Sequence, residues 1–183
     1  MDTIIHEMQD EVRKSSLMEG SNKTGIPFVT AWIFTSDKIR MPDTENPYLY
    51  IVLDGMLRLY TPSGIMDYVE GQYSISQIDT PLSGTVLTFS SRQDFLALSV
   101  EFTVFDIITA VLGLDNDLTE QIISENMYEQ VMSLSDKAVV QSVYRLFSIG
   151  KRRSPLNFCA KTSCKKSYIT FSAVPAENSF FKA

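Results

Sequence analysis

The sequence is short of the residues that hold metal ions and disulfides. It has one histidine, His6, and two cysteines, Cys159 and Cys164, among 183 residues. A zinc, iron or manganese site needs several converging histidine and carboxylate side chains, so we expect no metal site and no cofactor. Two cysteines this close together do not make a disulfide scaffold.

Long apolar runs and a secretion signal are missing as well. No hydrophobic stretch approaches the roughly 20 residues that cross a bilayer, and the N-terminus, Met1–Glu7, is acidic where a secretory signal is basic. Hydrophobic residues make up 44% of the chain and charged residues 21%, as in folded soluble proteins. We therefore expect a cytoplasmic protein with no membrane partner.

Positive charge is scarce in most of the chain. Residues 1–150 hold nine Lys and Arg against 21 Asp and Glu, a balance of −12, whereas residues 151–183 hold seven against one, a balance of +6. An acidic body of this size repels a phosphate backbone. Direct DNA binding is not expected from this chain.

The motifs of covalent and phosphate chemistry do not occur either. The sequence has no G-x-S-x-G elbow, no Cys/His pair in its central region and no Gly-rich loop opening a helix after a strand. We predict no catalytic residues and no enzymatic activity.

What the chain does have is a series of short apolar strands separated by turn residues. Gly55 and Gly71 stand where tight turns are needed, and Pro62-Ser-Gly64 predicts a hairpin. Seven short strands at this spacing indicate a sandwich or barrel. The predicted strands are 27–35, 48–53, 56–61, 65–69, 73–78, 84–90 and 95–102.

Helical periodicity flanks the strands. Residues 2–18 place Ile4, Ile5, Met8 and Val12 on one face, and residues 19–25 read as a linker. After the last strand, Thr103 and Asp106 form a T-x-x-D capping pattern for a helix. Two more helices are predicted over 117–125 and 136–149.

Aromatic side chains on the predicted strands are the candidate ligand contacts. Most aromatics simply fill a small barrel, but the polar tips of Tyr and Trp need a partner when buried, which a small-molecule pocket supplies. Arg58 alternates with Leu57 and Leu59, so it enters the barrel only if the leucines face outward; burial statistics favour the opposite arrangement about twofold. The candidates are Trp32, Tyr48, Tyr50, Arg58, Tyr68 and Tyr73.

Three segments in this order resemble the N-terminal cupin-like sensor domain of AraC-type transcription regulators. They are N-P-Y-L-Y-I-V-L-D-G from Asn46, Y-V-E-G-Q-Y-S-I-S-Q-I-D-T-P from Tyr68, and S-R-Q-D-F-L-A-L-S-V-E-F-T from Ser91. The resemblance covers residues 10–150, and the histidines that bind metal in some cupins are absent here. It implies an α+β, mainly β protein: a cupin-like antiparallel β-barrel or jelly roll followed by C-terminal helices, with an N-terminal helix. The chain then divides into a helix and linker (1–25), the barrel (26–103), a helical dimerisation segment (104–150) and an atypical basic tail (151–183).

The resemblance also implies a function. Such domains sense a small-molecule effector and dimerise, while a separate domain with helix-turn-helix units contacts DNA. The predicted helix 136–149 is apolar over more than half its circumference, so it needs a second partner beside the barrel. We expect a homodimer through Val139, Val143, Leu146 and Phe147.

The family pattern stops near Lys151. Reverse translation of Ser163–Lys182 in a shifted frame permits a sequence similar to the helix that ends AraC-type sensor domains. We therefore expect a truncated or frameshifted regulator that lacks its DNA-binding half; the plainer alternative is a poorly ordered basic tail with weak, salt-sensitive attraction to nucleic acid. A further alternative is a stand-alone cupin-like enzyme or binding protein for a small sugar or acid, which stoichiometric bound metal would favour.

Overall fold

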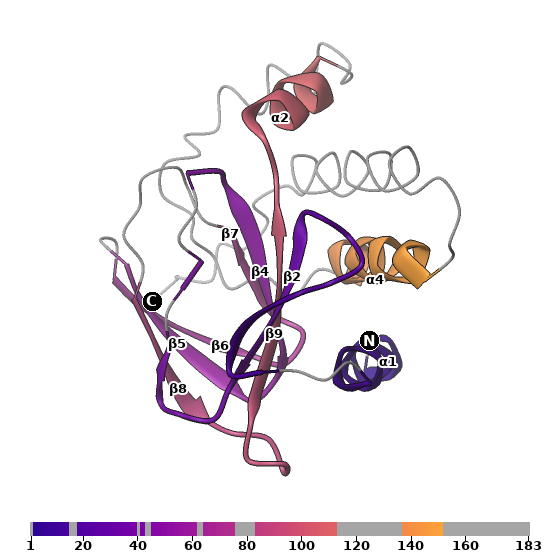
Figure 1. Cartoon of the computed structure of the whole chain (residues 1–183). Helices are drawn as coiled ribbons and strands as arrows, with labels where there is room; N and C mark the ends of the chain where they lie inside the picture. The colour runs from indigo at the N-terminus through magenta and orange to yellow at the C-terminus, as the bar shows by residue number, and fades with distance from the viewer. Residues whose placement is uncertain are drawn as a thin grey trace, which may run out of the picture.

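The computed structural model describes residues 2–14, 18–39, 41–42, 45–61, 64–75, 83–112 and 137–151. Within these ranges, nine β-strands form two antiparallel sheets, with strand orders β1-β2-β9-β4-β7 and β3-β8-β5-β6 (Figure 1). The elements are α1 Asp2–Arg13, β1 Gly20–Lys23, β2 Val29–Phe34, β3 Lys38–Ile39, β4 Tyr48–Asp54, β5 Met56–Thr61, β6 Gly64–Val69, β7 Tyr73–Ile75, β8 Ser83–Thr88, β9 Phe95–Glu101, α2 Val104–Val111 and α4 Lys137–Lys151.

The seven strands predicted from sequence are all present, and the mainly β, jelly-roll-like class is confirmed. The described strands form an open pair of sheets and not a closed barrel. Two strands were missed: β1 falls in the predicted linker, and β3 has two residues. The polar sequence of β1, G-S-N-K, shows no apolar alternation, because among the described strands β1 lies at the edge of its sheet and pairs with β2 alone.

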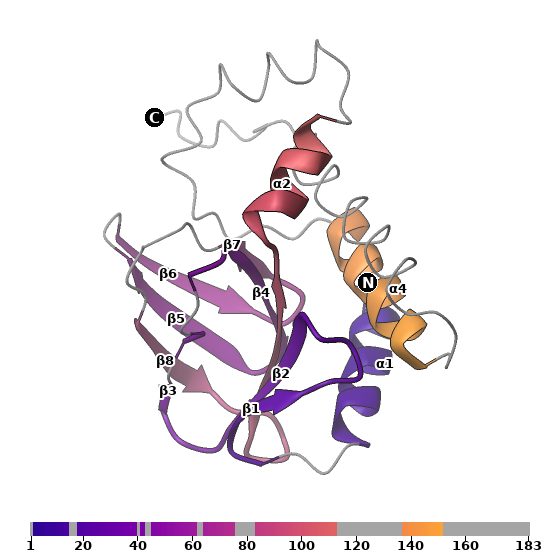
Figure 2. The same cartoon turned by 45° about the horizontal axis from the view of Figure 1, so that its top comes forward.

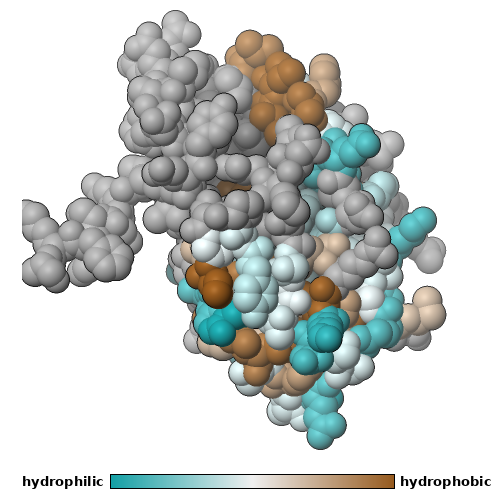
Figure 3. Space-filling model, turned by 90° about the vertical axis from the view of Figure 1, so that its left-hand side faces the viewer, coloured by the Kyte–Doolittle hydropathy of each residue, from teal (hydrophilic) through white to brown (hydrophobic). Residues whose placement is uncertain are grey.

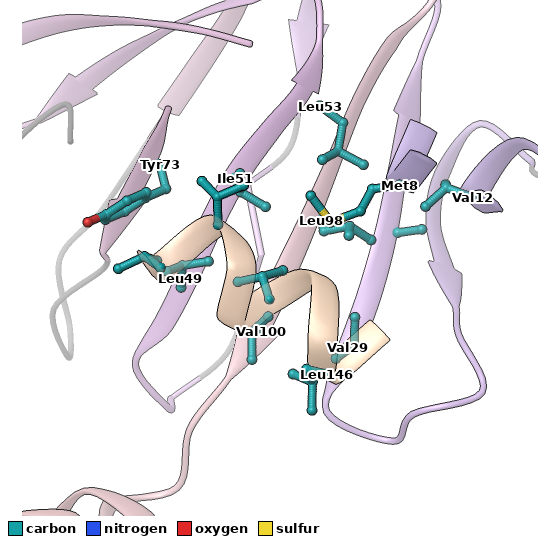
Figure 4. Close-up of a cluster of buried hydrophobic side chains, with 14 of the residues drawn as sticks. Met8, Val12, Val29, Leu49, Ile51, Leu53, Tyr73, Leu98, Val100 and Leu146 are labelled. Atoms are coloured by element: carbon teal, nitrogen blue, oxygen red, sulfur yellow. The ribbon is translucent and has the colours of Figure 1, made fainter. Parts of the chain in front are cut away.

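The strands β4 and β9 lie in the middle of the five-stranded sheet, and both of their faces are buried. Because side chains alternate along a strand, each strand supplies two cores. Leu49, Ile51 and Leu53 of β4 join the core under the helices, which Figure 4 shows. Tyr48 and Tyr50 join the core between the two sheets.

The helices α1 and α4 form a layer over the outer face of the five-stranded sheet (Figures 1 and 2). From α1, Ile5, Met8 and Val12 are at most 2% exposed, so the predicted amphipathic face is confirmed. The hydroxyl of Tyr144 on α4 donates a hydrogen bond to Glu7 on α1. Helices from opposite ends of the described chain thus pack as one unit.

This packing places the residues of the expected dimer stripe inside the domain. Val139, Val143 and Leu146 are at most 3% exposed and belong to the domain's own core under α1, and Phe147 packs partly buried against that core. The second partner that the wide apolar face of α4 requires is α1, together with the sheet. A double substitution of Val143 and Leu146 by Glu is therefore expected to unfold the domain and not to release a soluble monomer.

Local turn and cap predictions agree with the structure. Gly55 and Gly71 have φ angles of 92° and 80°, in the left-handed region that favours glycine. At Gly55 an added Cβ would also lie 2.6 Å from the carbonyl oxygen of Thr88. The backbone N–H of Asp106 donates to Thr103 Oγ1 (3.1 Å) and that of Thr103 to Asp106 Oδ2 (3.2 Å), which is the predicted capping pair. The predicted helix 117–125 and the tail from residue 152 lie outside the described residues.

A buried ion cluster ties α1 to the sheet. Arg13 donates to Oδ2 of Asp54 at the end of β4 (3.1 Å) and to Oδ1 of Asp94 just before β9 (2.5 Å). The three side chains are 10%, 23% and 12% exposed. Burial alone disfavours the guanidinium charge, but the hydrogen bonds and charges of Asp94 and Asp54 outweigh it and raise the pKa of Arg13.

We expect Arg13→Met to lower the free energy of unfolding by about 3–5 kcal/mol, because it leaves two largely buried carboxylates without their cation. Urea denaturation followed by circular dichroism measures this change in the free energy of unfolding. The matched control is Lys14→Met, whose ion pair with Glu11 is solvent-exposed (3.1 Å, Lys14 71% exposed) and contributes about 0–1 kcal/mol. Equal losses in the two variants would show that the cluster does not hold the helix.

Candidate functional site

Four of the predicted ligand contacts gather in the core between the two sheets. Tyr48 and Tyr50 on β4 and Tyr68 on β6 are at most 4% exposed, and the half-buried Trp32 on β2 packs against the same core. The ring of Trp32 stacks on Phe34 with centroids 6.2 Å apart and lies 6.3 Å from the ring of Tyr50. Both sheets therefore contribute aromatic side chains to the core between them.

The other two predicted contacts lie elsewhere. Tyr73 is fully buried on the opposite face of the five-stranded sheet, in the core under the helices (Figure 4). Arg58 is on the outer face of the four-stranded sheet, because Leu57 and Leu59 point inward and are at most 1% exposed. Its guanidinium donates to both carboxylate oxygens of Asp67, each at 2.7 Å. The structure does not bring Tyr73 or Arg58 to the interior.

A row of hydroxyl groups crosses the inner face of the five-stranded sheet. The strand register pairs Ser74 with Tyr50, Tyr50 with Ser99, and Ser99 with Thr30. Side chains of residues directly opposite one another in an antiparallel pair share one face of the sheet. We call Thr30, Ser99, Tyr50 and Ser74 the hydroxyl row.

The members of the row differ in their hydrogen bonding. Ser99 Oγ accepts a hydrogen bond of 2.8 Å from the indole Nε1 of Trp32. The hydroxyls of Tyr50 and Ser74, each 1% exposed, have no hydrogen-bond partner among the described residues. A buried hydroxyl without a partner costs roughly 1–3 kcal/mol, so these two groups on neighbouring strands are exceptions that a bound molecule would explain.

Sequence reasoning identified Tyr50 and Trp32 but missed Ser74, Ser99 and Thr30. The available signal was a single hydroxyl residue inside each apolar strand, as in L-A-L-S-V-E for Ser99. A lone serine in one strand says little. Only the register, which depends on pairings between distant strands, places these residues in one line.

Metal-ligating groups do not converge in the described ranges. No set of three or more His, Cys, Asp or Glu side chains that could hold a metal ion occurs there. His6 lies on α1, with its Nδ1 3.9 Å from Glu70 Oε1, away from the core between the sheets. None of the described helices is long and apolar enough to cross a membrane.

Comparison with known proteins identifies a family. A family model described as the AraC-type transcriptional regulator N-terminus matches residues 25–162, which extends past residue 151 into the segment set apart as a tail. No curated protein matches the sequence. Among solved structures, the cupin domain of Cnp3 from Schizosaccharomyces pombe is 11% identical with a TM-score of 0.37, covering 54% of this chain and 77% of that one.

Two further solved structures show the same kind of likeness. A cupin domain from Bordetella pertussis is 18% identical with a TM-score of 0.31, covering 48% of this chain and 97% of its own. A variant of oxalate decarboxylase from Bacillus subtilis is 17% identical with a TM-score of 0.31, covering 57% of this chain and 32% of its own. At these identities the likeness concerns the fold alone.

Two tyrosines in the core between the sheets, Tyr50 and Tyr68, have raised pKa values. Burial raises the pKa of Tyr68 to about 12. Burial, and then the neighbouring Tyr48, raise the pKa of Tyr50 well above its ordinary value. Both phenols therefore stay protonated over the whole neutral range, so the Tyr50 hydroxyl is available as a hydrogen-bond donor.

These shifts predict a loss of stability in alkali. A folded-state pKa above the unfolded value of about 10 stabilises the fold below pH 10, and this contribution disappears as the pH rises from about 10 through 12. Urea denaturation at several pH values should show the decline. Tyr68→Phe should make it shallower, whereas Tyr60→Phe, which changes an exposed tyrosine, should not. A decline of the same slope in Tyr68→Phe would contradict the assignment.

Proposed function

Because the chain belongs to the AraC-type transcriptional regulators, whose N-terminal domain spans its residues 25–162, we propose that it is the effector-sensing part of such a regulator. The effector is a small molecule bound between the two sheets, against the hydroxyl row. The protein acts by binding and not by catalysis. It works in the cytoplasm as a homodimer, and the acidic body formed by residues 1–150 does not contact DNA directly.

The observation that supports this proposal is the pair of buried, unpartnered hydroxyls of Tyr50 and Ser74. Each can both donate and accept a hydrogen bond. Beside them, the indole of Trp32 offers an aromatic surface, and its Nε1 is already satisfied by Ser99. An apolar and aromatic interior with a few convergent polar groups is what small-molecule sites in proteins have in common.

The polarity of the row also indicates the kind of ligand. Its hydroxyls are neutral, and among the described residues the buried charged side chain is Asp94, which pairs with Arg13. Burying a carboxylate without a cation costs far more than burying a neutral hydroxyl or carbonyl. The proposal therefore favours an uncharged effector with oxygen atoms over a small acid.

The strand β4 offers a route from the effector to the helices. Tyr50 points into the core between the sheets, while its neighbours Leu49 and Ile51 point to the opposite face, into the core that contains Val143 and Leu146 of α4. A ligand that moves β4 therefore acts on the surface that positions α4. Since α4 packs on this surface, it is the element through which the signal would leave the sheet.

The proposal is tested first without a ligand. Tyr50→Phe removes one hydroxyl that has no partner, so we expect the free energy of unfolding of the ligand-free protein to rise by about 1 kcal/mol. Ser74→Ala should act in the same direction. Tyr60→Phe is the matched control, since Tyr60 is 40% exposed and lies on the outer face of the other sheet. A loss of stability in Tyr50→Phe would mean that this hydroxyl has a partner in the fold, and the support for the site would be gone.

The second stage is a thermal-shift screen of neutral sugars and polyols beside the corresponding acids. A compound that stabilises the wild type should bind Tyr50→Phe and Ser74→Ala at least about tenfold less tightly, because each variant loses a hydrogen bond to the ligand. Its affinity for Tyr60→Phe should be unchanged. Undiminished binding to both interior variants would place the effector away from the hydroxyl row.

A further inference from the structure

Met66 lies on β6, which among the described strands is at an edge of the four-stranded sheet and pairs with β5 alone. Figure 3 looks onto the side of the molecule where this sheet lies, and both hydrophobic and hydrophilic residues reach the surface there. Because side chains alternate along a strand, Met66 and Tyr68 share the inner face of β6. Met66 is partly buried against the core between the sheets, whereas Tyr68 is 1% exposed. The thioether of Met66 therefore lies between solvent and core.

A hydrogen bond joins these two side chains. The hydroxyl of Tyr68 donates to Met66 Sδ, with 3.7 Å between the oxygen and the sulfur. A thioether sulfur is a weak acceptor, yet it is the partner that the described residues give this buried hydroxyl. Burial raises the pKa of Tyr68 to about 12, so the phenol remains a donor at neutral pH. A stronger acceptor at the position of the sulfur would satisfy this hydroxyl better.

We propose that Met66 is a modification site, at which a peroxide converts the thioether to a sulfoxide and the Tyr68 hydroxyl binds the new oxygen. The sulfur lone pair attacks one oxygen of hydrogen peroxide, and the O–O bond breaks. The second oxygen takes up the proton of the transferred hydroxyl and leaves as water. Methionine is thereby oxidised by two electrons and peroxide is reduced by two. Tyr68 is not consumed, since it only donates a hydrogen bond to the oxygen on which negative charge develops.

The geometry of the pair fits the oxidised form. With an S–O bond of about 1.5 Å, a hydroxyl that donates to the sulfoxide oxygen over about 2.75 Å, at an angle of about 120°, lies about 3.7 Å from the sulfur. Tyr68 Oη is already 3.7 Å from Met66 Sδ. The hydroxyl therefore need not move to bind the sulfoxide. An oxygen placed in the core without a donor would instead lower the stability of the fold.

The other methionines of the described residues lack this combination. Met8 and Met41 are 0% and 6% exposed, so the fold shields their sulfur atoms from a peroxide in solution. Met18 is 74% exposed, and Met56 is partly exposed on the outer face of the four-stranded sheet. No hydroxyl among the described residues donates to the sulfur of either. Met66 alone in this part of the chain combines partial exposure with a donor in place.

Peroxide treatment of the folded full chain, followed by peptide mass spectrometry, tests the site. The quantity measured is the oxidation rate of Met66 divided by that of Met56 in the same molecule, because a general loosening of the sheet affects both. In the wild type this ratio should exceed one. Tyr68→Phe removes the donor and keeps the ring, so it should lower the ratio about fivefold, the effect of one ordinary hydrogen bond. Tyr60→Phe is the matched control on the outer face and should leave the ratio unchanged.

The melting temperature after oxidation is a second readout. Oxidation should lower it more in Tyr68→Phe than in the wild type, because the sulfoxide oxygen then has no donor in the core. The same comparison in chains that also carry Met66→Leu removes the sulfur in question. In that background, oxidation should lower the melting temperatures of the two proteins equally.

Three results would overturn the inference. They are a wild-type ratio of one or less, a ratio that Tyr68→Phe leaves unchanged or raises, and equal losses of melting temperature on oxidation in the wild type and Tyr68→Phe. The inference is independent of the effector site, because Met66 and Tyr68 lie on the four-stranded sheet and the hydroxyl row lies on the other. The readouts also need no effector, so failure here would leave the proposed function untouched.

Discussion

The rest of the structure depends on the burial of β4 and β9 on both faces. A strand in this position must satisfy two cores at once, because successive side chains point in opposite directions. Its helix-facing residues, such as Leu49 and Leu98, are aliphatic and pack under α1 and α4. Its inward residues, which include the aromatic Tyr48 and Phe95, meet the second sheet. A one-residue slip in register would exchange the two sets, so that neither set would meet its proper layer.

This two-sided burial explains why the hydroxyl row matters. In an exposed strand, a serine or tyrosine hydroxyl is satisfied by water and needs no explanation. In β4, β7 and β9 the same groups are sealed between layers, so Tyr50 and Ser74 incur a cost that the fold alone does not offset. Proteins tend to accept such local costs at functional sites. The row is therefore informative because of where it is placed, and not because of its composition.

The sequence predicted the strands well because local signals determine them. Alternation, turn glycines and the Thr103–Asp106 cap are properties of short windows, and each of them recurs in the structure. The site was predicted less well, because it depends on which strands pair. Trp32, Tyr48, Tyr50 and Tyr68 share an interior, but Tyr73 does not, although it is as aromatic as the others and also buried. The position of Tyr73 along β7 decides on which face of the sheet its side chain lies. That face cannot be predicted until the pairing of the strands is known.

The packing of α4 shows the same limit of prediction from sequence, since it also depends on a distant segment of the chain. The wide apolar face of α4 indicated two packing partners. The periodicity of its sequence does not identify the second partner. The structure supplies α1, which is more than 100 positions away in sequence and is held on the sheet by Arg13 between Asp54 and Asp94. With α1 in place, the helix layer is closed, and the sheet face left open is the one around Arg58. Arg58, which sequence reasoning named as a candidate ligand contact, thus lies on the outer face of the four-stranded sheet beside Asp67, because Leu57 and Leu59 occupy the core between the sheets.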